Sequence, residues 1–267
     1  MKKDDLGDRI KMYESNYSLK LLPTLPVVVR LDGKSFSRFT KGLQRPYDKR
    51  LSDLMIETTK FLLKEFNFNI GYTQSDEITL AFYNKDPKSQ IDFNGKLFKL
   101  QSTLAAYTSV FFNKNLIKYL PEKVGEFPTF DCRAFNVPTL EECVNAIYWR
   151  ELDATKNSIS MASSTFYSHK QLQNKNSKDK QEMLFQKGVN WNDYPSFFKR
   201  GTYVQRKRVN RKFTTDELSK LPKKHKAFSN PDLKIERWDI KKLDVPPLSK
   251  IENKVGFILF GEDPVQI

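Results

Sequence analysis

Three acidic side chains stand directly after two predicted β-strands. Asp32 follows the β-branched run over residues 27–31, and Asp76 and Glu77 lie in the turn after the predicted strand 69–73. The stretch between these strands is long enough for one helical crossover, and a right-handed crossover makes the two strands parallel. Parallel strands end at the same edge of a sheet. The sequence therefore predicts that the three carboxylates gather at one sheet edge.

The chemistry predicted for this edge is phosphate transfer assisted by metal ions. Clustered carboxylates repel one another unless cations neutralise them, and oxygen ligands without Cys or His favour Mg²⁺. Two such ions roughly 3.5–4 Å apart support in-line displacement at phosphorus. Gly33 would let the backbone approach a metal ion or a phosphate closely. The candidate cations for a triphosphate are Lys34, Arg45, Lys96 and Lys99.

The elements that position this edge alternate between strand and helix patterns. Apolar spacing predicts helices over residues 48–66 and 95–113, the first with Asp48 as its N-cap. Two further strands are predicted over residues 78–83 and 128–134. The resulting order, βαββαβ, indicates an α+β fold with a ferredoxin-like sheet. Either acidic turn alone fits ordinary hairpin chemistry, but together they are typical of a polymerase-type or cyclase-type palm.

The second half of the chain has a less regular pattern. A long helix is predicted over residues 140–170, followed by a polar loop over residues 171–180. The remainder is basic, is interrupted by prolines and ends in a strand-like run over residues 255–260. We therefore expect residues 1–140 to form a compact catalytic half. Residues 141–267 are expected to supply additional helices and a basic C-terminal region packed on that half, giving one compact unit.

The positive charge is concentrated in one segment. The net charge is +14, and residues 199–226 contain eleven Lys or Arg against two acidic residues. Aromatic side chains are interleaved with them (Phe197, Phe198, Tyr203 and Phe213), as in grooves that hold phosphates and stack bases. A charge run is often only a solvated face, but this combination favours a nucleic-acid partner.

The few cysteines and histidines exclude other classes of protein. Cys132 and Cys143 are the two cysteines, and His169 and His225 are the two histidines, without the spacing of a zinc site. Two cysteines are too few for a disulfide scaffold and are expected to be thiols in a reducing cytoplasm. No apolar run approaches the roughly 18 residues of a membrane span, so no membrane partner is expected.

Five sequence motifs in order along the chain resemble the tRNA(His) guanylyltransferase superfamily. They are GDRIKMYE from residue 7, RLDGKSFSRFTKG from residue 30, RPYDKRLSDLM from residue 45, YTQSDEITLAF from residue 72 and PSFFKRGTYVQRK from residue 195. The helix that carries Lys96, Lys99 and Ser102 belongs to the same pattern. Members of this superfamily add nucleotides to the 5′ end of RNA. The resemblance implies a polymerase-type palm, two Mg²⁺ ions, ATP and GTP or other nucleoside triphosphates as substrates, tRNA as partner, and a homotetramer built as a dimer of dimers.

The resemblance also implies roles for individual residues. Asp32, the Gly33 carbonyl and Asp76 would hold the metal ions, and Glu77 belongs to the same catalytic acidic motif. Asp48 would lie near the base of the activating nucleotide. The residues expected to bind nucleotides are Asp32, Gly33, Lys34, Ser35, Phe36, Ser37, Arg45, Asp48, Ser75, Asp76, Lys96, Lys99, Lys180 and Asn190. Together with the charge distribution, the resemblance predicts RNA contacts by Lys156, Asn157, Lys199, Arg200, Arg206, Lys207, Arg208 and Arg211.

One departure from the superfamily pattern bears on the reaction. Eukaryotic tRNA(His) guanylyltransferases carry an HINNLYN-like motif on the long helix, whereas residues 153–168 here read DATKNSISMASSTFYS and contain no His. This pattern resembles the branch that repairs 5′-truncated tRNA by template-directed addition. The alternatives are addition of a single 5′ G to tRNA(His) and a non-catalytic basic RNA-binding module. The intact carboxylates argue against the binding module, because repulsive charges beside phosphates are of no use to it.

Overall fold

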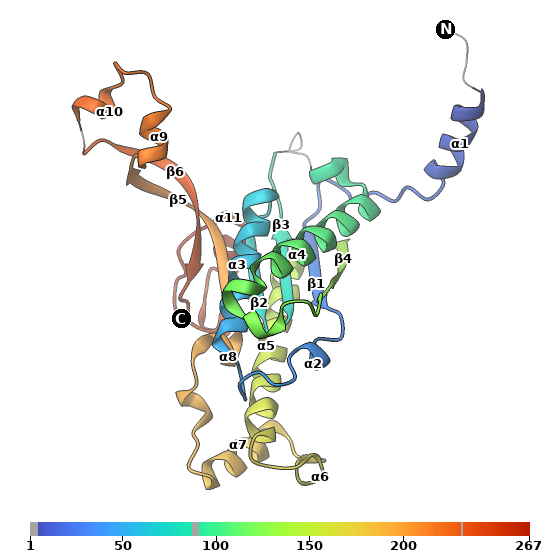
Figure 1. The fold of residues 1–267 in the computed structure, drawn as a ribbon, viewed down its shortest axis with the longest axis vertical. Helices are drawn as coiled ribbons and strands as arrows, with labels where there is room; N and C mark the ends of the chain where they lie inside the picture. Colours follow the sequence, from blue (N-terminus) through green and yellow to red (C-terminus); the bar gives the residue numbers. More distant parts are fainter. Residues whose placement is uncertain (1–4, 87–90, 231) are drawn as a thin grey trace.

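The computed structural model describes residues 5–86, 91–230 and 232–267 of the 267-residue chain. Within these residues six strands form one sheet, in the order β4-β1-β3-β2-β5-β6, and every neighbouring pair is antiparallel (Figure 1). The strands are β1 (Val27–Gly33), β2 (Ile70–Gln74), β3 (Glu77–Phe82), β4 (Phe130–Asn136), β5 (Thr202–Lys212) and β6 (Lys234–Leu243). The protein is thus a mixed α/β protein whose single sheet contains strands from both halves of the chain.

The first four strands and two long helices follow the predicted order. β3 pairs with both β1 and β2 in the antiparallel sense, so β1 and β2 run in the same direction, as predicted. α3 (Lys49–Glu65) begins at Asp48, whose side chain accepts a hydrogen bond from Arg50 N–H as an N-cap. α4 (Leu97–Tyr119) continues six residues beyond the predicted end at residue 113. Both helices pack on one face of the sheet, where their buried apolar side chains form the largest core cluster.

The opposite face of the sheet is covered by two helices, α5 (Leu140–Ser164) and α11 (Lys254–Phe260). α11 replaces the strand predicted over residues 255–260. A short apolar run fits a buried strand and a buried helix equally well, because its periodicity does not separate them. Here Phe257, Ile258 and Leu259 are all buried, and Gly261, with φ 72°, ends the helix.

α5 extends beyond the edge of the sheet and forms a lobe with short helices. These are α6 (His169–Leu172), α7 (Ser177–Gln186), the 3₁₀ turn η3 (Trp191–Asp193) and α8 (Ser196–Arg200). α5 ends at Ser164, short of the predicted residue 170, and residues 171–180 are partly helical rather than a loop. The reason is a capping box at the start of α7, in which the Asn176 and Asp179 side chains bond each other's backbone N–H groups.

β5 and β6 continue past the sheet as a two-stranded arm, which projects at the upper left of Figure 1. Two short helices close its tip, α9 (Thr215–Ser219) and α10 (Lys226–Ser229). Sequence reasoning missed both strands, because in the arm they bury little apolar surface and their side chains are mostly charged. The remaining elements are α1 (Asp5–Ser15), α2 (Phe36–Phe39), η1 (Asp92–Gly95), η2 (Pro121–Lys123) and η4 (Leu248–Lys250).

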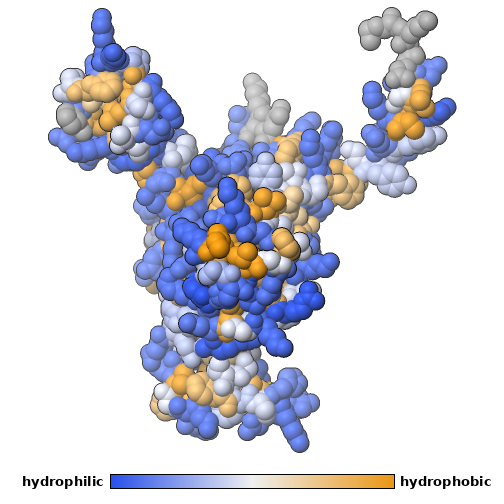
Figure 2. Space-filling model, in the orientation of Figure 1, coloured by the Kyte–Doolittle hydropathy of each residue, from blue (hydrophilic) through white to orange (hydrophobic). Residues whose placement is uncertain are grey.

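The surface is mainly hydrophilic. Figure 2 shows one apolar patch in the middle of the view, over the C-terminal half of α4, where Val110 and Ile117 are exposed. α1 projects from the body and buries none of its side chains. Across the described ranges, no helix combines the length and apolar character that a bilayer span requires.

Arg206 fixes the arm to the body through a helix end. Its Nη2 donates to the carbonyl oxygens of Leu63 and Phe66, at the C-terminus of α3. Such carbonyls lack partners within their own helix, and a cation also complements the helix dipole there. Arg206, predicted to contact RNA, is therefore occupied within the fold.

We expect Arg206→Ala to lower the free energy of unfolding by about 1–3 kcal/mol, because buried carbonyl groups lose their donor. Urea unfolding followed by circular dichroism measures this. Arg208→Ala is the matched control, because Arg208 is exposed on the same strand and its loss should change stability by less than about 0.5 kcal/mol. Equal effects of the two substitutions would contradict the capping role.

Candidate active site at the acidic edge of the sheet

The structure brings Asp32 and Asp76 to the same edge of the sheet, as predicted. The turn between β2 and β3 is tight: Gln74 pairs with Glu77, and Ser75 adopts a left-handed conformation with φ 53°. The Gly33 N–H donates to the Asp76 carbonyl over 3.1 Å, which joins the end of β1 to this turn. The two carboxylates therefore come from adjacent backbone segments held by a direct hydrogen bond.

The environment of Asp76 disfavours its negative charge. Burial raises the pKa of Asp76 to about 6, and the nearby charge of Asp32 adds to this effect. A cation would relieve both costs. The donor set of two carboxylates and the Gly33 carbonyl consists of hard oxygen ligands and fits Mg²⁺. In the part of the chain that the structure describes, no three or more His, Cys, Asp or Glu side chains converge as a metal site.

Glu77 lies opposite Asp32 in the register of β1 and β3, but its carboxylate is bound by an arginine of α5. Arg150 of α5 donates to both of its oxygens, Nε to Oε1 over 2.5 Å and Nη2 to Oε2 over 2.7 Å. Arg30 Nε lies 3.9 Å from Glu77 Oε2, and Arg150 Nη2 also donates to Asp153 over 3.1 Å. Glu77 thus belongs to a buried ion cluster between the sheet and α5.

Sequence reasoning missed Arg30, Arg150 and Asp153. Two signals could have found them. Arg30 and Asp32 are two residues apart on one strand and so share a face. Arg150 and Asp153 are three residues apart, on one side of the long helix.

The segment after β1 wraps around the same edge. A Cβ at residue 33 would lie 2.3 Å from Phe36 Cδ2, so glycine is required there. Phe36 is buried and packs against other aromatic rings of the core, so its side chain is not available to a nucleotide. Lys34, Ser35 and Ser37 are exposed beside the edge, and Ser35 has φ 57°. Three of the four side chains predicted here are therefore accessible to phosphate.

A cavity of about 100 Å³ opens beside the turn. The residues that line it include the aromatic residues Tyr47, Phe197 and Phe198. Three predicted nucleotide-binding residues, Arg45, Asp48 and Ser75, share the cavity with these three rings. The Asp48 carboxylate also pairs with Arg50, whose Nη2 lies 2.8 Å from Oδ2. This pairing is the main cause that lowers the pKa of Asp48, which keeps it ionised.

The lobe beyond the edge carries another group of predicted residues. Lys180 donates to Ser160 of α5 over 3.0 Å, and the Asn190 side chain caps η3. Lys199 donates to the carbonyl of Asn192, and burial lowers the pKa of Lys199. Lys156 and Asn157 are exposed on α5. Arg200 is the last residue of α8, shortly before β5 begins.

Lys96 and Lys99 are not brought to the acidic edge. β3 leads away from the edge, so α4 starts at the opposite end of the sheet, where Lys96 forms a β-bridge with Lys20. Only the C-terminal part of α4 lies near Gly33. Its Asn113 side chain donates to the Pro128 carbonyl, and Phe130, two residues further on, pairs with Gly33 in the sheet. A role for these two lysines at this edge would require a second chain.

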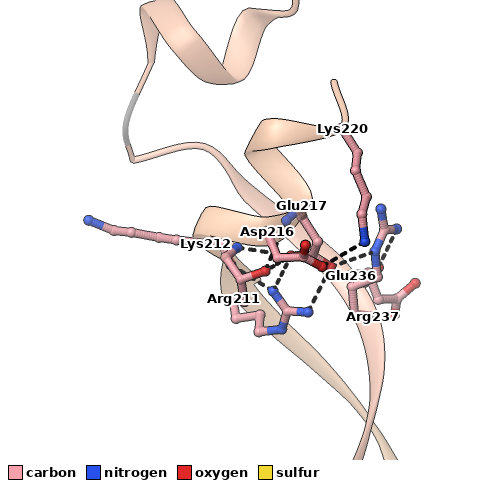
Figure 3. A network of polar contacts seen from close by, with 8 residues as sticks. Arg211, Lys212, Asp216, Glu217, Lys220, Glu236 and Arg237 are labelled. Atoms are coloured by element: carbon pink, nitrogen blue, oxygen red, sulfur yellow. Dashed lines mark hydrogen bonds and ion pairs between the residues drawn. The ribbon is translucent and has the colours of Figure 1, made fainter. Parts of the chain in front are cut away.

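The arm uses several predicted RNA contacts for its own structure. Arg211 donates to both carboxylate oxygens of Glu217, and Figure 3 shows this pair at the centre of a network with neighbouring ion pairs. Lys207 donates to the Gly261 and Glu262 carbonyls and pairs with Asp263. Arg208 is exposed beside Trp238, 5.0 Å from its ring centroid.

These geometries define a nucleotide-handling edge: a carboxylate pair suited to a divalent cation, an accessible loop and an adjacent cavity. Comparison with known proteins agrees with this class. Residues 7–138 match the family described as tRNAHis guanylyltransferase, and residues 140–245 match the Thg1 C terminal domain. The tRNA(His) guanylyltransferase of Neurospora crassa is 31% identical over 216 residues, which cover 74% of this chain and 71% of that protein. The tRNA(His) guanylyltransferase of Saccharomyces cerevisiae is 31% identical over 211 residues, covering 70% and 85%.

Solved structures show the same relationship. A bacterial tRNA(His) guanylyltransferase (Thg1)-like protein in complex with ATP superposes with a TM-score of 0.75 at 34% identity, covering 92% of this chain and 95% of that one. A bacterial (Thg1)-like protein in complex with GTP gives a TM-score of 0.71 at 32% identity, with the same coverage. The chain belongs to the tRNA(His) guanylyltransferase family. It is accordingly a nucleotidyltransferase.

Replacing the buried carboxylate should stabilise the metal-free protein. We expect Asp76→Asn to raise the free energy of unfolding by roughly 1–2 kcal/mol at pH 8, because a neutral amide removes both the burial cost and the repulsion from Asp32. Urea unfolding in EDTA measures this. Asp131→Asn is the control, since Asp131 pairs with Asp32 in the register of β4 and β1 but is exposed. A destabilised Asp76→Asn variant would contradict this account.

Proposed function

We propose that this chain is a template-dependent nucleotidyltransferase that adds nucleotides in the 3′–5′ direction to the 5′ end of truncated tRNA, after ATP-dependent activation. The observation that carries the proposal is the position of Asp32 and Asp76 at one edge, beside a cavity lined by Arg45, Asp48 and Ser75. Bacterial (Thg1)-like proteins with ATP and GTP bound support both nucleotide roles.

In the proposed reaction, the 5′-phosphate of the RNA first attacks the α-phosphorus of ATP, and pyrophosphate leaves. The 3′-hydroxyl of the incoming nucleotide, paired with the template base, then attacks the RNA 5′-phosphorus, and AMP leaves. Asp32, Asp76 and the Gly33 carbonyl would hold two Mg²⁺ ions, which when bound neutralise phosphate charge and lower the pKa of the attacking hydroxyl. Phosphoryl transfer of this kind needs mainly positioning and charge neutralisation from the protein.

The side chains around the edge would position the two nucleotides. Arg45 is exposed at the cavity and would pair with a triphosphate. Asp48, held ionised by Arg50, would accept hydrogen bonds from the base of the activating nucleotide. Lys180 and Asn190, in the lobe, would hold phosphates that extend beyond the edge.

A second candidate is tRNA(His) guanylyltransferase activity, the addition of a single G, which is the activity in the names of the fungal relatives. Residues 153–168, without a histidine, favour templated repair over this reaction. Lys96 and Lys99 lie away from the edge, and in the proposed dimer of dimers a neighbouring subunit would supply them.

Nucleotide incorporation distinguishes these activities. On a tRNA lacking its 5′-terminal nucleotide, with ATP, Mg²⁺ and all four nucleoside triphosphates, we expect addition that follows the opposing template base to full stem length. A single G added to full-length tRNA(His) regardless of the opposite base would favour the second candidate. Asp32→Ala should abolish both activation and addition while RNA affinity stays within about twofold. Substantial residual addition by this variant would contradict the assignment of the edge.

The lysines at the arm tip are cations of the basic segment that are exposed and available to RNA. Among the described residues, no hydrogen-bond or ion-pair partner is found for the side chains of Lys223, Lys224 or Lys226, all three exposed. Replacing all three with Gln should weaken tRNA binding. The slope of the logarithm of the binding constant against log[salt] should become shallower by about 2–3, because each duplex phosphate neutralised contributes about 0.9 to that slope. Filter binding over a salt series measures this. An Arg211→Gln variant, which removes a cation already paired with Glu217, should change the slope by less than about 1. An unchanged slope in the triple variant would make the tip a solvated surface.

A further inference from the structure

Glu77 stands beside both candidate cation ligands but is bound elsewhere. It follows Asp76 in the chain and pairs with Asp32 in the register of β1 and β3. Its two carboxylate oxygens accept from the Nε and Nη2 of Arg150, over 2.5 and 2.7 Å. Such two-pronged guanidinium–carboxylate pairs are both strong and specific in geometry. The side chain of Glu77 is therefore committed to α5.

The surroundings hold Arg150 in this orientation. Its side chain is 12% exposed, and its Nη2 also donates to Asp153 on the same helix. Its guanidinium carbon lies 4.5 Å from the ring centroid of Trp149. Arg30 approaches Glu77 from β1, with 3.9 Å between Nε and Oε2. Two guanidinium groups and two carboxylates thus form a cluster with no net charge.

Burial makes this pairing important for the charge of the whole edge. Glu77 is buried, with 8% of its surface exposed, and Arg150 supplies the positive charge that faces its carboxylate. Removing one partner of a buried ion pair leaves an uncompensated charge, whereas replacing both partners is far better tolerated. Without Arg150, the edge would carry a further unpaired carboxylate next to Asp32 and Asp76.

We propose that Arg150 is a positioning residue that holds Glu77 against α5, so that Glu77 adds no unpaired negative charge beside Asp32 and Asp76 at the acidic edge. This inference rests on the proposed function, because it assumes that the edge binds a divalent cation. Arg150 itself touches neither nucleotide nor RNA in this role. It sets the number of carboxylates at the edge, and hence the cation affinity.

The test is Mn²⁺ binding to the full-length, nucleotide-free chain, followed by electron paramagnetic resonance. The edge signal is defined as the bound Mn²⁺ that disappears in Asp76→Asn. The informative variants are Arg150→Gln and the double variant Glu77→Gln/Arg150→Gln, in which neither side chain is charged. Arg133→Gln is the matched control, because Arg133 lies opposite Arg30 on β4, and its loss changes the net charge equally but releases the exposed Asp131, 3.9 Å away, instead of Glu77.

Arg150→Gln should bind Mn²⁺ about tenfold more tightly than the wild type, because the freed Glu77 adds one negative charge close to the divalent ion. Arg133→Gln should tighten binding by less than about threefold. The double variant should return to within about twofold of the wild type. Its two amides can still hydrogen-bond and bury no charge, so it is expected to fold even where Arg150→Gln does not.

Three results would overturn the inference. Mn²⁺ binding weakened more than about fivefold in the double variant would make Glu77 a cation ligand in the wild type. Binding by Arg150→Gln no tighter than by the control would show that Arg150 does not restrain Glu77. If the wild type shows no edge signal, the inference also fails, while templated addition by the same preparation decides the proposed function separately.

Discussion

One backbone hydrogen bond, from the Gly33 N–H to the Asp76 carbonyl, joins the end of β1 to the turn between β2 and β3. It places two carboxylates on adjacent backbone segments, and the rest of the edge accommodates the resulting charge. Gly33 lacks a Cβ, so Phe36 packs directly on it. Arg150 pairs with Glu77 and so balances the charge of the carboxylate opposite Asp32. The remaining negative charge is concentrated where a cation and phosphates would meet.

The parts of the fold predicted correctly are those that local patterns define. β-branched runs, helical spacing and the Asp48 cap locate the strands and helices of the first half, and a right-handed crossover brings Asp32 and Asp76 together. The pairing of Glu77 with Arg150 links residues 73 positions apart, and no local pattern marks it. The far position of Lys96 follows from the direction of β3, which residue types do not show.

The basic segment illustrates why composition overestimates binding surface. Its cations fall into two groups that the sequence does not distinguish. Arg206 caps a helix and Arg211 pairs with Glu217, so both stabilise the arm. The lysines at the tip remain exposed. Net charge therefore indicates a polyanionic partner, but contacts within the fold decide which cations can reach it.

The pairing of β5 with β2 has a consequence for synthesis of the chain. Thr73 of β2 lies opposite Thr202 of β5, so the hydrogen-bonding partner of one strand is translated 129 residues after it. During translation, the first four strands would have an uncovered edge until β5 leaves the ribosome. Unpaired strand edges invite association with other chains. The edge of β2 in the first half of the chain is thus completed only when the second half has been made.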